Sequence, residues 1–127
     1  MNTSVIAGQS QLIASGILTS TGEISKDKIN LISGAYIPEF AETVWTLTDG
    51  DPDTQTRMFD IFNQLFSEGR EDEMLDLLRL LYDVVGLAFP ADVGLLAEHP
   101  EARRYFLFSF LLDLDECTQE FMDEATG

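Results

Sequence analysis

The chain has 127 residues, of which 45% are apolar, and its formal net charge is −16. This length fits one domain, and nine Phe residues are atypical of a disordered acidic tail. The negative charge disfavours direct binding to nucleic acid or to an anionic membrane and favours a basic protein partner. We expect a single acidic helical domain over residues 1–127, with residues 1–22 forming an N-terminal helix that is either mobile or docked.

The negative charge is confined to one part of the chain. Residues 1–38 carry two acids, Glu23 and Asp27, and two lysines, whereas residues 39–127 carry 21 acids and five arginines. Adaptation of a whole proteome to high salt spreads acids over the entire surface, so this uneven pattern is more typical of a binding surface. Adaptation to salt stays open as the alternative explanation.

The sequence also bears on the cellular compartment. One cysteine, Cys117, cannot form an internal disulfide, which suits a reducing compartment. Residues 1–21 contain no Lys or Arg and lack the basic start of a signal peptide. The longest uncharged apolar run, Tyr105–Leu112, is far shorter than the roughly 20 residues of a membrane span. We therefore predict a cytoplasmic protein with no membrane contact.

Apolar residues recur at helical spacing along the chain. The first stripe consists of Val5, Ile6, Gln9, Leu12, Ile13 and Ile17. Ser25 is a typical N-cap for a helix that starts at Lys26, and Pro38 ends or kinks this helix, although its apolar stripe continues to about Thr48. Asp51 as N-cap and Pro52 at the first position predict a helix over 52–68, which stops at Gly69.

The helix expected over 71–86 is apolar around most of its circumference, which predicts a central position in the fold. Its single polar strip consists of Asp72, Asp76, Arg79 and Asp83. Residues 91–98 form a short helix or turn, and the last helix runs from Pro100 to about Ala125. These elements together predict an all-α, compact single-domain bundle of four to six helices.

The segment Asp49–Asp60 has carboxylates at positions 1, 3, 5 and 12, as a helix–loop–helix calcium site does. Thr54 stands where that loop requires Gly, and Asp60 is shorter than the bidentate Glu. We therefore predict an N-capping turn without a metal, and weak calcium binding stays open.

The sequence contains no motif that indicates catalysis or cofactor binding. One His and one Cys cannot assemble a zinc site, and the chain contains neither a nucleophile elbow nor a phosphate-binding glycine loop. We predict that the protein is not an enzyme and holds no cofactor.

The last helix carries acids where helix stability disfavours them. Asp113, Glu116, Glu120, Asp123 and Glu124 fall within about 100° of arc. Like charges at this spacing repel one another, and the dipole disfavours anions near a helix C-terminus. We predict that these five acids, together with Asp72, Asp76 and Asp83, bind a basic partner. A simple solvated face is the alternative.

Two functional hypotheses follow from these patterns. In the first, the protein is an inhibitor or decoy that covers a basic, nucleic-acid-binding surface of another protein. Small acidic proteins of viruses and mobile elements that disarm host nucleases are similar in composition, although no motif here matches any one of them. In the second, it is an adaptor or assembly chaperone that binds a partner through apolar helix faces. The apolar run Tyr105–Leu112 lies in the core or forms a self-association seam, so a homodimer is possible.

Overall fold

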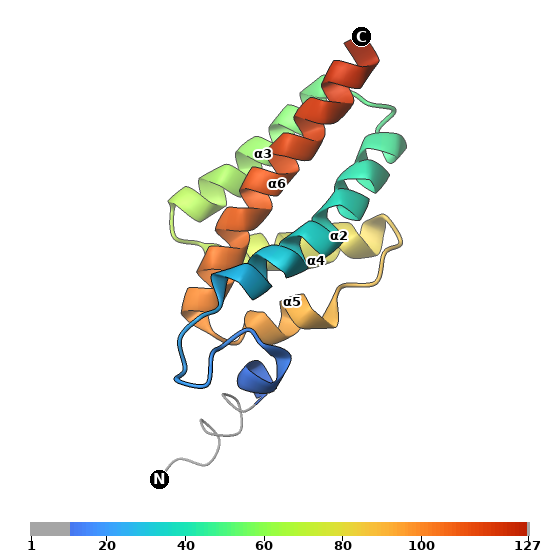
Figure 1. The fold of residues 1–127 in the computed structure, drawn as a ribbon. Helices are drawn as coiled ribbons and strands as arrows, with labels where there is room; N and C mark the ends of the chain where they lie inside the picture. Colours follow the sequence, from blue (N-terminus) through green and yellow to red (C-terminus); the bar gives the residue numbers. More distant parts are fainter. Residues whose placement is uncertain (1–10, 127) are drawn as a thin grey trace.

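The computed structural model describes residues 11–126, and the side chains of residues 11–124. Residues 11–15 are helical, and five further helices follow: α2 (Lys26–Leu47), α3 (Pro52–Ser67), α4 (Glu71–Val84), α5 (Ala91–Leu96) and α6 (Pro100–Thr126). Within this range, the single β contact is an isolated bridge between Leu18 and Ile24. The prediction of an all-α helical bundle is confirmed (Figure 1).

The long helix α6 lies at the centre of the bundle. Both α2 and α3 pack along it, while α4 and α5 contact its lower half (Figure 1). The prediction that the helix over 71–86 is central is therefore wrong. The physical reason is that α4 exposes part of its wide apolar circumference, including Leu80 at 57% and Val84 at 70%. Apolar residues around most of a helix therefore do not show that the helix is buried on every side.

Capping residues set the predicted helix starts. The Ser25 hydroxyl accepts a hydrogen bond from the backbone N–H of Lys28 at 3.4 Å, and the Asp51 carboxylate accepts one from Asp53 at 3.3 Å. Both are N-caps, as the sequence predicts. Gly69, with φ of 73°, adopts the left-handed conformation just after α3.

Helix α2 continues through Pro38, so of the two predicted effects of this proline, an end or a kink, the end does not occur. Proline removes the hydrogen bond to the carbonyl four residues earlier, which belongs to Gly34. Both Pro38 and Gly34 are exposed, so water can reach the carbonyl that lacks its usual partner. The other face of α2 stays packed in the core and holds the helix together.

An aromatic cluster joins the four long helices. Phe40 of α2 stacks on Tyr82 of α4 with ring centroids 4.9 Å apart, and Phe62 of α3 meets Phe110 of α6 edge to face, also at 4.9 Å. Phe40 and Phe110 lie 6.3 Å apart and connect the two pairs. All four rings are buried, so this cluster is the centre of the core.

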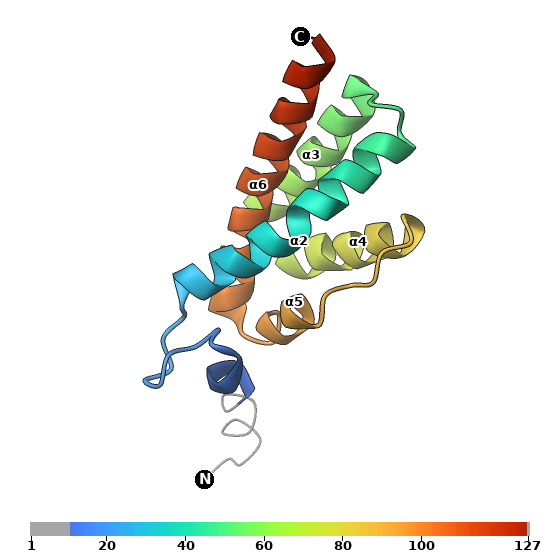
Figure 2. The same cartoon turned by 45° about the vertical axis from the view of Figure 1, so that its right-hand side comes forward.

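Among the described residues, α2, α3 and α6 form the upper end of the bundle (Figure 2). The tight turn between α2 and α3 brings Gly50 against Trp45, where an added Cβ would lie 3.0 Å from the ring. Trp45 in turn packs on Phe121 of α6, with centroids 5.4 Å apart. Buried Gln55 donates a hydrogen bond to the Thr48 hydroxyl at 2.6 Å and closes the corner.

The described part of the N-terminal stripe is docked. Leu12, Ile17 and Leu18 are buried in the core, whereas Ile13 is partly exposed. Val5, Ile6 and Gln9 lie outside the described residues. Over residues 11–126, none of the helices has the length and apolar character that crossing a bilayer requires.

Candidate functional site

Most of the positive charge lies at the lower end of the molecule and is used within the fold. Arg103 Nη1 lies 2.5 Å from Asp72 Oδ1, and Arg104 pairs with Glu71, so the start of α6 is tied to the start of α4. Arg70, in the α3–α4 turn, pairs with Glu68 at 2.9 Å and with Glu73. We call these seven residues the ion-pair cluster.

The pKa values of Glu68, Arg70 and Glu71 are shifted in the directions that favour their charged forms. The Arg70 guanidinium, which donates to Glu68, lowers the pKa of that carboxyl. Hydrogen bonds to Glu73 and Glu68 raise the pKa of Arg70 itself. The pKa of Glu71 is lowered first by its own backbone N–H and then by Arg104. Hydrogen bonds within the fold therefore stabilise the charged forms of Glu68 and Glu71.

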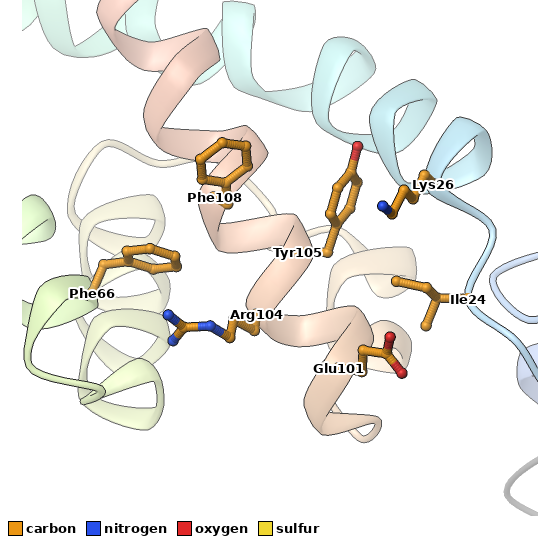
Figure 3. Close-up of a pocket in the computed structure, with 7 residues that line it drawn as sticks. All are labelled: Ile24, Lys26, Phe66, Glu101, Arg104, Tyr105 and Phe108. Carbon is orange, nitrogen blue, oxygen red and sulfur yellow. The ribbon is translucent and has the colours of Figure 1, made fainter.

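An open cleft of about 480 Å³ lies beside this cluster, between the start of α2, the end of α3 and the start of α6 (Figure 3). Its two cations are held over aromatic rings. The Arg104 guanidinium lies 4.7 Å from the centre of Phe66, and Lys26 Nζ lies 5.6 Å from the centre of Tyr105. Glu101 also lines the cleft. Arg104 thus makes a cation–π contact as well as an ion pair, and Lys26 makes a cation–π contact.

The upper part of α6 is different, because acids dominate its exposed face. Glu116, Glu120 and Glu124 are exposed and recur every four residues, so they form one row along the helix, which we call the distal row. No Lys or Arg follows Arg104 in the sequence, and the last turn of α6 has no basic residue. In the described part of the chain, no ion pair reaches the distal row.

The structure separates the predicted binding residues into three groups. Asp72 is paired with Arg103, and Asp113 is half-buried and accepts a hydrogen bond from Ser33 of α2, so both acids have partners within the fold. Asp76 and Asp83 are exposed on α4. The distal row and exposed Asp123 lie on the upper half of α6.

The two predicted acidic strips do not form one surface. The α4 strip begins beside Arg103 and Arg104, where the two helices are linked. Glu116 lies twelve residues further along α6, which corresponds to about 18 Å. Sequence periodicity places residues on a helix face, but it does not show where two helices cross.

The turn before α3 uses its acids locally. Asp51 caps α3 and accepts a hydrogen bond from the Thr54 hydroxyl at 2.6 Å, which lowers the pKa of Asp51. Asp49 has a left-handed backbone with φ of 55°. Among the described residues, no three or more His, Cys, Asp or Glu side chains gather where they could hold a metal ion. The predicted N-capping role of Asp51 is confirmed.

Cys117 lies one turn from both Asp113 and Glu120 on α6 and is half-buried. Burial raises the pKa of its thiol, and the negative charges of Glu120, Asp113 and Glu116 raise it further. The thiol therefore stays protonated and is a weak nucleophile. The raised pKa of this thiol reflects its burial and the negative charges around it, and Cys117 is not a candidate nucleophile.

The apolar run Tyr105–Leu112 lies mostly in the core. Phe106, Leu107, Phe110 and Leu111 are buried. Phe108 and Leu112 are the exceptions, since they are 47% and 56% exposed. Of the two predicted roles of this run, core or self-association seam, the core therefore accounts for the four buried side chains.

An apolar groove that the sequence pattern did not predict lies between the end of α2, the start of α3 and the end of α4. It has a volume of about 380 Å³. Its lining includes Val44, Leu47, Met58, Ile61, Leu81 and Val84. The sequence did contain one indication of this groove. Apolar residues cover more of the circumference of α4 than the helix can bury against a single core, so some of them stay exposed.

We compared the chain with known protein families, curated proteins and solved structures. No protein-family model, curated protein or solved structure matches the chain. The arrangement of charges and apolar surfaces is therefore the basis for a functional proposal.

Proposed function

We propose that the chain is a non-enzymatic, acidic protein-binding module that covers a basic surface of a partner protein. The observation that supports this most directly is the distal row, Glu116, Glu120 and Glu124. Neighbouring acids about 6 Å apart repel one another, and the dipole at the helix C-terminus further disfavours Glu124, which lies in the last turn of α6. The folded protein alone gains nothing from this row, whereas a partner with basic residues supplies the missing opposite charge.

A nucleic-acid-binding protein is the kind of partner that fits best. Such proteins carry lysine and arginine along a surface that follows a line of phosphates. A row of carboxylates on a helix presents a similar line of negative charge. The net charge of −16 also accelerates encounter with a basic surface at low salt. In this role the protein acts as an inhibitor or decoy.

An adaptor or assembly chaperone is the second candidate. The observation that favours it is the apolar groove between α2, α3 and α4, where Leu47 and Val84 are 61% and 70% exposed. Binding through apolar area survives high salt, whereas binding through exposed charges does not.

A capture experiment distinguishes these functions. The full chain is immobilised and exposed to a lysate of the organism that encodes it, at about 0.05 M and about 0.5 M salt. A second sample carries Glu116→Gln, Glu120→Gln and Glu124→Gln. A matched control carries Glu23→Gln, Glu42→Gln and Glu98→Gln, three exposed acids on other parts of the chain.

We expect the parent and the control to capture the same basic proteins at low salt, and the distal-row variant to lose them. High salt or added duplex DNA should release the captured proteins, because DNA competes for the same basic surface. Equal capture by all three proteins would contradict a role for the distal row. Capture that persists at high salt and in the presence of DNA would favour the adaptor.

A further inference from the structure

We propose that the groove between α2, α3 and α4 is the docking site for an amphipathic helix of the partner, in which basic residues flank an apolar stripe. This inference rests on the proposed function, because it assumes a basic protein partner. It extends the proposed function by naming the surface that recognises the partner and the secondary structure of the partner segment that binds there. The groove has an apolar floor and two acidic rims.

The floor of the groove is apolar and accessible. Leu47, Ile61 and Val84 contribute to it from three different helices, and they are 61%, 50% and 70% exposed. Its volume of about 380 Å³ falls within the range of about 300–1,000 Å³ that is typical of binding pockets. Apolar side chains from a helix that lies between α3 and α4 can fill such a space.

The rim formed by α3 is acidic. Thr54 and Ile61 line the groove, and the residues directly before them are Asp53 and Asp60, both exposed. A spacing of seven residues is about two turns, so the two acids lie on one side of α3, about 10 Å apart. Phe62, directly after Ile61, is buried in the core, so the acids lie on the outer side of the groove.

The rim formed by α4 repeats this arrangement. Leu77 and Val84 line the groove, and the residues directly before them are Asp76 and Asp83, both exposed. Leu78, directly after Leu77, is buried in the core. The acids of α4 therefore also lie on the outer side, and the apolar floor has a pair of carboxylates along each wall.

The charge of the rims selects the occupant. Four carboxylates border the groove, and Arg57 is the one cation in its described lining. Lysine or arginine residues on both sides of an apolar stripe match this pattern. A second copy of this chain brings the same acidic rims and a net charge of −16, so charge repulsion disfavours it. Residues 1–10 contain no Lys or Arg and lack the complementary charge.

A defined peptide tests the proposal. The probe is a dye-labelled peptide of about 18 residues, built from Leu and Lys so that a helix has one apolar stripe with lysines on both sides. Fluorescence anisotropy measures its binding to the full chain. One comparison peptide has the same composition in scrambled order, and another replaces every Lys with Glu. We expect binding of the first peptide and at least about tenfold weaker binding of the other two.

Substitutions at exposed positions map the site without disturbing the core. Ile61→Ser with Val84→Ser should weaken binding at least about tenfold, because it removes apolar contacts from the centre of the groove. Asp76→Asn with Asp83→Asn should weaken binding several-fold and reduce its salt dependence. Leu31→Ser with Leu112→Ser is the matched control, since these residues are 69% and 56% exposed and lie outside the groove. This control should bind like the parent.

Other results would overturn the docking proposal. If the scrambled peptide binds as tightly as the amphipathic peptide, binding reflects general charge attraction and not docking of a helix. If the Glu peptide binds as tightly, the acidic rims do not select the partner. Binding that depends on Glu116, Glu120 and Glu124 but not on Ile61 and Val84 would place the site on the distal row and leave the proposed function standing. Sedimentation as a dimer that Ile61→Ser with Val84→Ser abolishes would show that a second copy covers the groove.

Discussion

The two halves of α6 use their side chains in opposite ways. In the lower half, Phe106 and Phe110 are buried, and Arg103 and Arg104 pair with acids of α4. In the upper half, Phe121 packs on Trp45, but the exposed face carries the distal row with no paired cation among the described residues. Acids that stabilise this fold therefore have identifiable partners. The distal row lacks them, so stability does not explain it.

The largest expected effect concerns the buried side of the lower half. Phe110→Ala should reduce the free energy of unfolding by about 3–5 kcal/mol, because it leaves a cavity beside Phe40 and Phe62, which both pack on the Phe110 ring. Leu112→Ala is the control on the same helix and should change stability by less than about 0.5 kcal/mol, since Leu112 is 56% exposed. Urea unfolding measures both. Similar losses in the two variants would contradict the assignment of the core.

The second prediction concerns Tyr82, which packs in the same aromatic cluster. Burial raises the pKa of Tyr82 to about 12, from an ordinary value of 10.0. Between these two pH values the native state keeps a proton that the unfolded chain loses, so the free energy of unfolding falls as pH rises. The expected loss attributable to this residue is up to about 2 kcal/mol.

Tyr82→Phe isolates this effect. At neutral pH it should be less stable than the parent by about 1 kcal/mol, because the Tyr82 hydroxyl donates to the Tyr36 carbonyl at 3.2 Å. Above pH 10 it should lose less stability than the parent does. An unchanged slope would show that Tyr82 ionises equally well in the folded and unfolded chain.

A smaller effect sharpens the description of the acidic half. Glu120 and Glu116 contribute to the raised pKa of the Cys117 thiol, although burial is the larger cause. Glu116→Gln with Glu120→Gln should therefore increase the rate of alkylation by iodoacetamide near pH 8, by less than about tenfold. Glu23→Gln with Glu98→Gln is the control, which should react like the parent. No difference between the variants would mean that the row has little effect on its surroundings.

Local signals in the sequence predict the helices well. Ser25, Asp51 and Pro52 set the starts of α2 and α3, and Gly69 follows the end of α3 in the conformation that glycine favours. These residues act through neighbours in the chain, so their effect can be predicted without the tertiary structure. Local signals leave open whether Pro38 ends or kinks a helix, because its cost depends on whether water reaches the Gly34 carbonyl, which is a property of the assembled bundle.

The candidate sites were predicted only in part. Helical periodicity correctly places Glu116, Glu120 and Glu124 on one exposed face of α6. It could not predict that Asp72 pairs with Arg103 or that Asp113 bonds to Ser33, because these contacts join residues far apart in the sequence. The groove depends in the same way on how α2, α3 and α4 meet, so it becomes visible only in three dimensions.

The most direct test of this account is the stability of the variant that carries Glu116→Gln, Glu120→Gln and Glu124→Gln. Its free energy of unfolding is compared with that of the matched control, Glu23→Gln, Glu42→Gln and Glu98→Gln, at about 0.05 M and about 1 M salt. We predict that the distal-row variant is more stable than the control at low salt, by a few tenths to about 1 kcal/mol, and that high salt reduces the difference. A distal-row variant that is less stable than both the control and the parent at low salt would show that the row stabilises the fold, and would contradict its role as a surface kept for a partner.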